Sequence, residues 1–172
     1  PRSAPPTAIA AIAGNNQSTL AGAAVTIRPA VRVTDASNNG VRGVTVTFAV
    51  ASGGGSVSSA TQTTNDSGVA SVGGWTLGPT VGANTLTATA AGLGSAPVTF
   101  TANGFQFQVV VAGNNQTCSL MTSGAAFCWG LNSLGALGDG TTSNSSVPVA
   151  VAGGLTFQLL TTGINTCGIV AG

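Results

Sequence analysis

The stretch that decides the fold is VTVTFAV, residues 44–50, in which apolar side chains alternate with threonine and alanine. A period of two places one set of side chains on a buried face and the other toward water, which is typical of a strand in a half-buried sheet. TLTATA at 85–90 and PVTFTA at 97–102 repeat the pattern. Residues 44–50 therefore predict an all-β fold whose outward face is rich in threonine.

Turn-forming sequences separate these segments. DASNNG at 35–40, ASGGGS at 51–56, TNDSG at 64–68 and LGPTVG at 77–82 consist of residues that tolerate positive φ or cap their own backbone. Pro29 cannot donate a ladder hydrogen bond, so it predicts an edge or a bulge within the apolar segment 25–33. About seven short strands at this spacing, between residues 7 and 103, predict an antiparallel β-sandwich.

Charge is scarce in this chain. The 172 residues include four Lys or Arg, three Asp or Glu and no His, so charged residues make up 4% and hydrophobic residues 43%. Four scattered arginines do not form the cation cluster that a phosphate backbone needs, so nucleic-acid binding is not expected. Without His or Lys the usual acid–base and nucleophilic chemistry is not available either. We therefore predict a non-catalytic protein with no cofactor, no metal and no small-molecule substrate. No run approaches the roughly 18 apolar residues that a membrane helix needs, so no membrane span is expected either.

Four segments of the first half resemble a known domain. They are VRVTDASNNGVRGVTVTF at 31–48, TTNDSGVAS at 63–71, WTLGPTVGANTLTATAAG at 75–92 and VTFTANG at 98–104. Together, over residues 14–104, they resemble the bacterial Ig-like domain group 1 of invasin and intimin type surface proteins. The resemblance implies an Ig-like sandwich that acts as a spacer and presentation module in an extracellular or cell-surface protein.

The second half contains a repeat. GFQFQVVVAGNNQTC at 104–118 aligns with GLTFQLLTTGINTC at 154–167, which pairs Phe107 with Phe157 and Gly113 with Gly163 at a separation of about 50 residues. A period of this size made of strand-sized pieces predicts propeller blades. Residues 105–172 also resemble the repeat of the regulator of chromosome condensation family, and would supply one full blade and the start of a second. The residues that carry this resemblance are Trp129, Gly130, Asn132, Gly135, Leu137, Gly138, Gly140 and Pro148, directly after Cys128.

All three cysteines of the chain lie in its second half. Cys118 and Cys128 stand ten positions apart around a Ser-Gly turn, so two paired strands would bring them together as a disulfide; buried reduced thiols are the alternative. Three cysteines without histidine cannot complete a tetrahedral zinc site. Cys167 takes the place of Cys118 in the second repeat and has no mate. Either the sequence continues in a longer protein, or another subunit completes the blade by strand addition or an intermolecular disulfide.

These observations predict an extended Pro-rich linker over 1–12, an Ig-like β-sandwich over 13–103 and a propeller-type repeat region over 104–172. The expected function is that of an extracellular structural and adhesion segment, with a spacer sandwich and a repeat that presents an interaction surface to a protein partner or to another copy. Two other functions remain open. One is a filament protomer assembled by inter-subunit β-strand complementation, and the other is an accessory module of a secreted enzyme.

Overall fold

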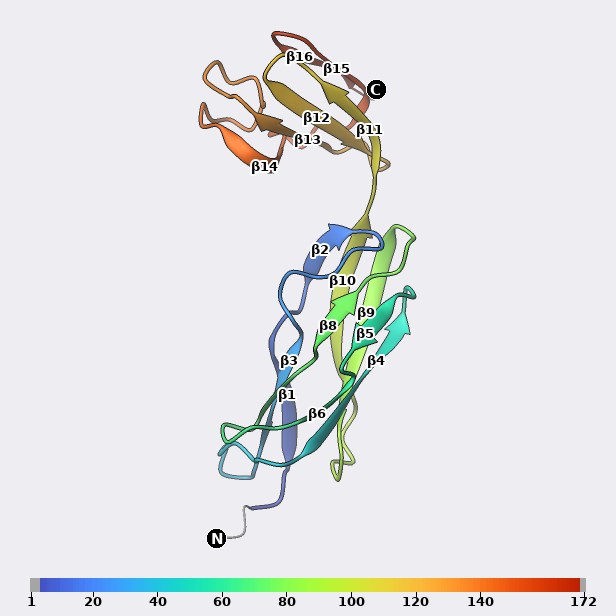
Figure 1. Ribbon diagram of the computed structural model, residues 1–172, viewed down its shortest axis with the longest axis vertical. Coiled ribbons are helices and arrows are strands. Elements are labelled where there is room, and N and C mark those ends of the chain that lie inside the picture. The colour runs from blue at the N-terminus through green and yellow to red at the C-terminus, as the bar shows by residue number, and fades with distance from the viewer. Residues whose placement is uncertain (1–3, 171–172) are drawn as a thin grey trace. The chain divides into compact units, whose positions relative to one another are not determined.

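The structure, a computed structural model, describes residues 4–170, and in this range every regular element is a β-strand (Figure 1). The chain divides into two compact units, Pro1–Phe105 and Gln106–Gly172, here called unit 1 and unit 2. Each unit has its own cluster of buried apolar side chains. We describe the two units separately.

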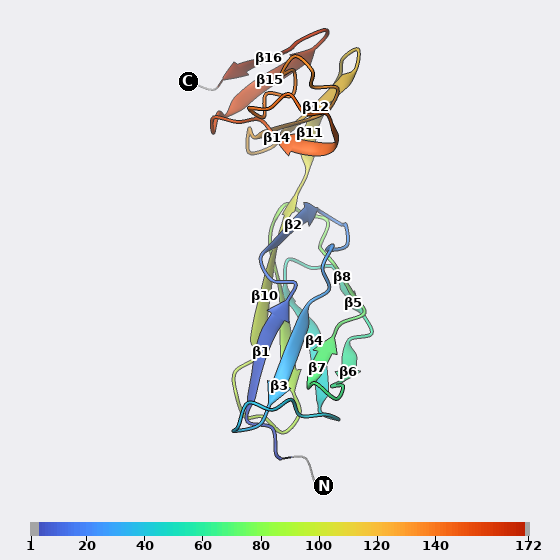
Figure 2. The same cartoon turned by 90° about the vertical axis from the view of Figure 1, so that its left-hand side faces the viewer.

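Unit 1 is a sandwich of two main sheets. Its strands are β1 (Ala8–Ala13), β2 (Gln17–Leu20), β3 (Ala30–Thr34), β4 (Thr45–Ser52), β5 (Ser56–Ser58), β6 (Thr61–Thr63), β7 (Val69–Ser71), β8 (Gly74–Thr76), β9 (Gly82–Ala90) and β10 (Val98–Phe105). One sheet has the order β1-β3-β7, the other the order β2-β10-β9-β4-β6, and β5 pairs with β8. β1 and β3 run side by side, while β2 lies parallel to β10 in the other sheet (Figure 2). Apart from the parallel strand β2, both sheets are antiparallel, and two such sheets packed on one core form an Ig-like sandwich.

The core of unit 1 follows from the alternation in its strands. Val46 and Phe48 of β4 are buried, and so are Leu86 of β9 and Phe100 of β10. Val31 and Val33 of the opposite sheet complete the same cluster with Trp75. The intervening threonines point away from this core, which is what the sequence pattern predicted.

The start of the sandwich differs from the sequence prediction. We predicted a linker over 1–12, but β1 already begins at Ala8 and pairs with β3; residues 1–3 lie outside the described residues. The strand was missed because AIAAIA is rich in alanine and its two isoleucines are three positions apart, so it lacks a period of two. The apolar segment 25–33 also differs from the prediction, because it does not form one continuous strand and β3 begins only at Ala30. Pro29 directly precedes β3, where its missing N–H costs no ladder hydrogen bond.

Unit 2 consists of one four-stranded sheet and one hairpin. The sheet contains β11 (Phe107–Ala112), β12 (Gln116–Met121), β13 (Ala126–Gly130) and β14 (Ser145–Ala150) in chain order, all antiparallel. This is the arrangement of a propeller blade, and we call the sheet the blade. The hairpin is formed by β15 (Phe157–Thr162) and β16 (Thr166–Val170).

The hairpin repeats the first half of the blade residue by residue. Val111 pairs with Cys118 across β11 and β12, and Thr161 pairs with Cys167 across β15 and β16. Both hairpins carry a register shift at the corresponding place, between Phe107 and Val109 and between Phe157 and Leu159. The sequence repeat is therefore a repeat of structure.

Candidate interaction surface

A disulfide joins the two central strands of the blade. Cys118 and Cys128 lie directly opposite each other in the register of β12 and β13, with Cα atoms 4.1 Å apart and a bond between their sulfur atoms. The connecting turn is tight, because Gly124 has a φ of 81° and donates to the carbonyl of Met121 at 2.9 Å. Both cysteines are fully buried. The bond therefore lies inside the apolar cluster of unit 2 and holds β12 and β13 together.

A long loop between β13 and β14 is organised by Asn132. This side chain is fully buried, and its Oδ1 accepts the N–H of Leu137 at 2.8 Å. Its Nδ2 donates to the carbonyls of Thr141 and Ser143, each at 3.1 Å. Leu137 is thereby held in the cluster of unit 2 with no exposed surface. One amide thus shapes the loop that carries most of the repeat motif.

The other motif residues have backbone or packing roles. Gly130 has a φ of 116°, and a Cβ there would overlap the carbonyl oxygen of Asn115. The ring of Trp129 lies 6.4 Å from that of Phe107. Pro148 lies in β14, an edge strand, where a missing N–H is tolerated. The remaining motif glycines, which all have positive φ in the loop, are Gly135, Gly138 and Gly140.

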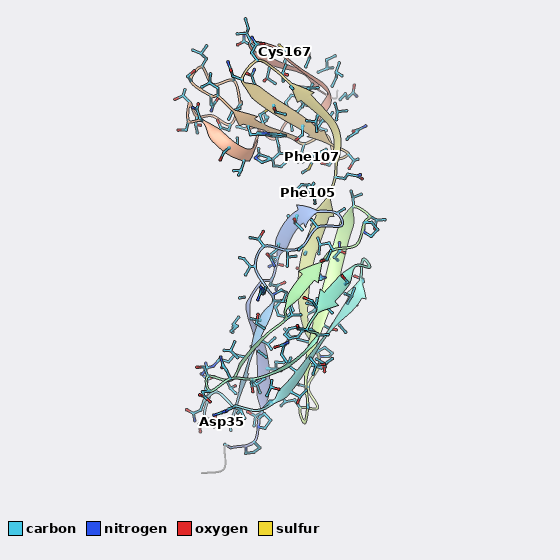
Figure 3. All side chains as sticks on the ribbon, viewed as in Figure 1. Asp35, Phe105, Phe107 and Cys167 are labelled. Atoms are coloured by element: carbon cyan, nitrogen blue, oxygen red, sulfur yellow. A yellow bond between two sulfur atoms is a disulfide. The ribbon has the colours of Figure 1, made fainter. Side chains whose placement is uncertain are left out.

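Two aspartates cap turns. The backbone N–H of Asn39 donates to Asp35 at 2.9 Å and lowers the pKa of that carboxyl (Figure 3). The backbone N–H of Thr141 does the same to Asp139, also at 2.9 Å, and lowers its pKa. Hydrogen bonds to the charged form favour that form. Both carboxylates therefore accept hydrogen bonds from the backbone of their own turns.

The hairpin β15–β16 packs against one face of the blade. Leu160 enters the cluster of Cys118 and Leu120 and is only 4% exposed. The buried Gln116 donates through Nε2 to the carbonyls of Gly163 and Ile164, at 3.1 and 3.2 Å. We did not predict this role for Gln116. The repeat alignment places it directly after the turn, at the start of β12, but alignment alone does not say which faces meet.

Cys167 is free and exposed on β16 (Figure 3). Its register position matches that of Cys118, but among the described residues no strand pairs with the outer edge of β16. The thiol therefore stands at the position where the blade carries its disulfide.

Large apolar side chains are exposed beside the hairpin turn. Leu131, Leu134 and Ile164 are 42%, 84% and 74% exposed, and they line a hollow of about 150 Å³ together with Asn114 and Asn115. We call this hollow, lined by the three apolar and two asparagine side chains just named, the apolar hollow. The sequence did not predict it, because its members come from three separate turns and loops.

The described residues that line the hollow include no titratable side chain. Within residues 4–170, no three His, Cys, Asp or Glu side chains come together as a metal site would require. The same range contains no helix with the length and hydropathy of a membrane span. The hollow thus offers apolar contact and amide hydrogen bonds.

Comparison with solved structures finds intimin and a Yersinia adhesin among the similar proteins. Among solved structures, a C-terminal 282-residue fragment of intimin in complex with the translocated intimin receptor (Tir) intimin-binding domain matches with 17% identity and a TM-score of 0.48. The match covers 73% of this chain and 58% of that fragment, less than two thirds of its length. The D0-D1 domain of intimin matches with 15% identity and a TM-score of 0.44, covering 84% of this chain and 68% of that one. The adhesin InvE of Yersinia pseudotuberculosis matches with 17% identity and a TM-score of 0.42, covering 83% and 36%.

The sequence comparisons concern unit 2. A search of curated proteins finds no significant match. The family model of the Regulator of chromosome condensation (RCC1) repeat matches residues 123–166, which run from the disulfide turn through β13, the Asn132 loop, β14 and β15. Over this segment the chain is therefore similar to the RCC1 repeat, in agreement with the resemblance noted in the sequence.

Proposed function

We propose that the chain is a non-catalytic structural and adhesion segment of an extracellular or cell-surface protein. In this proposal unit 1 is a spacer, and unit 2 presents the apolar hollow to a protein partner. The observation that carries it is the exposure of Leu131, Leu134 and Ile164 around one hollow. Contiguous exposed apolar side chains with a polar rim are typical of protein–protein contact sites.

The disulfide supports an extracellular location. Disulfides persist in oxidising compartments and are rare where thioredoxin and glutathione keep thiols reduced. The Cys118–Cys128 bond is buried within the blade, where it ties β12 to β13. The scarcity of charge agrees with a surface that binds through apolar and amide groups, since charged residues form only 4% of the chain.

Adhesion by cells that display the full protein containing this segment, here called the parent protein, tests the proposal. The parent protein is displayed with its native sequence, with Leu134→Asp, or with the control Thr89→Asp on the exposed face of unit 1. We expect antibody to label intact cells, and we expect Leu134→Asp to reduce adhesion at least tenfold while Thr89→Asp leaves it unchanged. Labelling only after permeabilisation, or equal adhesion by Leu134→Asp cells, would contradict the proposal.

A second candidate is a filament protomer, favoured by Cys167 and by the open edge of β16. A strand of a second copy added to this edge would continue the sheet of the hairpin, as β13 continues the sheet beside β12. Non-reducing gels and electron microscopy test it. Filaments that persist in Cys167→Ser material would support strand complementation, filaments that disappear would indicate an intermolecular disulfide, and monodisperse monomers with a free thiol would rule out both.

A further inference from the structure

The chain contains two Asn-Gly pairs, Asn39-Gly40 and Asn103-Gly104, and both asparagines are exposed. In such a pair the backbone nitrogen of glycine can attack the side-chain carbonyl carbon of asparagine, because glycine has no side chain that would block the approach. The backbone must rotate before this attack, so regular hydrogen-bonded structure slows it. A difference in reactivity between the two pairs therefore depends on their surroundings.

The pair Asn103-Gly104 lies inside a sheet. Asn103 of β10 is aligned with Ala83 of β9 on one side and with Ser18 of β2 on the other. Gly104 is buried and also has a neighbouring strand on each side. Three strands would have to separate before this backbone could rotate, so we expect the pair to react slowly.

The pair Asn39-Gly40 lies in the turn between β3 and β4. The N–H of Asp35 donates to the carbonyl of Asn39 at 2.9 Å. The next bond of the turn runs from the N–H of Val41 to the carbonyl of Val33 at 3.0 Å. Among the described residues, no hydrogen bond uses the N–H of Gly40. The nitrogen that must attack is therefore not engaged, and rotation of this backbone requires only the short turn to move.

The side chain of Asn39 contributes to the turn through Asp35. Its Nδ2 donates to Oδ2 of Asp35 at 3.2 Å, and its backbone N–H donates to Oδ1 at 2.9 Å. The N–H of Ser37 donates to the same Oδ1, also at 2.9 Å. A carboxylate in place of the Asn39 amide would remove one of these donors and place a second negative charge beside Asp35. The turn therefore depends on the amide of Asn39.

We propose that Asn39 is a site of spontaneous deamidation, and that its conversion loosens this turn. The nitrogen of Gly40 bonds to the side-chain carbonyl carbon of Asn39, and the side-chain nitrogen leaves as ammonia with the proton of the Gly40 nitrogen, which closes a cyclic imide. One water molecule then opens the imide. Attack at one carbonyl gives aspartate, and attack at the other gives isoaspartate, in which the main chain runs through the former side chain. Water is consumed and ammonia is released, and no oxidant or reductant takes part.

The isoaspartate product has a second effect, because it lengthens the main chain directly before Gly40. This glycine is tightly packed, since a Cβ there would overlap the carbonyl oxygen of Ser67. The added length therefore cannot be absorbed at Gly40, and we expect it to shift the turn away from the neighbouring loop 64–68. The inference goes beyond the proposed adhesion function, because it concerns unit 1 and uses neither the apolar hollow nor a partner.

Peptide mass spectrometry of the purified parent protein, aged in mildly alkaline buffer, tests the chemistry. Trypsin releases residues 33–42, which contain Asn39, and chymotrypsin releases residues 101–105, which contain Asn103. Replacement of NH₂ by OH raises the mass of a peptide, and a sample digested before ageing gives the background. We expect Asn39 to be converted at least about tenfold faster than Asn103, because less structure has to open. Equal rates at the two sites, or no gain in mass at residues 33–42, would overturn the proposal.

Substitutions separate the reaction from its effect on the turn. Asn39→Gln keeps an amide, but its longer side chain closes a ring less readily, so residues 33–42 should gain no mass; a gain there would assign the reaction to Asn38 and overturn the proposal. Asn103→Gln is the matched control and should leave the rate at Asn39 unchanged. Asn39→Asp reproduces one product, so hydrogen exchange over residues 35–41 should be faster than in the parent protein, and equal exchange would contradict the loosening of the turn.

Discussion

Removing the blade disulfide should destabilise unit 2 and leave unit 1 unaffected. The perturbation is the double substitution Cys118→Ala and Cys128→Ala. The bond closes a loop with a sequence separation of 10 residues. In the chain-entropy relation such a loop contributes about 2.7 kcal/mol at 25 °C, or about a hundredfold in the unfolding equilibrium. Because the two units have separate cores, the loss should be confined to the unit that contains the bond.

Urea unfolding followed by tryptophan fluorescence measures this effect, since unit 1 contains Trp75 and unit 2 contains Trp129. The double variant should lower the free energy of unfolding of unit 2 by about 2–4 kcal/mol, which includes lost packing of two buried side chains. The matched control is Cys167→Ser, which removes an exposed thiol and should change nothing. An equal loss in both units, or an equal loss in the control, would refute the reasoning.

Three further predictions concern the loop, the hairpin and the turns. Asn132→Ala should lower the free energy of unfolding of unit 2 by about 1–3 kcal/mol, because it leaves the buried N–H of Leu137 without its partner and removes the bonds to the carbonyls of Thr141 and Ser143; urea unfolding measures this, and a loss below about 0.5 kcal/mol would argue against the network. Leu160→Ala should detach the hairpin, so hydrogen exchange should accelerate in β15 and β16 but not in β13; equal acceleration in all three strands would contradict a separately docked hairpin. The lowered pKa values of Asp35 and Asp139 give stability that is present above the unfolded pKa of about 3.9 and is lost as pH falls through the lower folded pKa. Melting temperatures should therefore be flat from pH 8 to 5 and fall in acid, with Asp139→Asn flattening the acid fall of unit 2 and Asp35→Asn that of unit 1; no change in either variant would contradict the assigned hydrogen bonds.

Much of the fold could be read from short-range pattern. The alternation in β4, β9 and β10 depends only on neighbouring residues, and it specifies which side chains enter the core of unit 1. The 50-residue repeat likewise specified that β15 and β16 copy β11 and β12. Strand β1 was not predicted, because its alanine-rich sequence has no strand pattern. Its extended conformation depends on pairing with β3, which is distant in the sequence.

The candidate surface could be predicted only in part. The motif pointed to Asn132, and the structure gives this amide a role, since it accepts the N–H of Leu137 and donates to the carbonyl of Thr141. The apolar hollow depends on distant loops that meet beside the hairpin turn, so its members share no local pattern. The roles of Gln116 and Leu160 depend on which face of the blade receives the hairpin, and a period of two leaves that choice open.

Site-specific photo-crosslinking on intact cells tests the central claim most directly, since the claim is that unit 2 makes the functional contact through its apolar hollow. A photoreactive amino acid would replace Leu134 in the displayed parent protein, and a control would replace Thr89 in the same way. The account predicts a protein adduct from position 134 and none from position 89. Adducts from position 89 alone, or no adduct from position 134 on adherent cells, would contradict it.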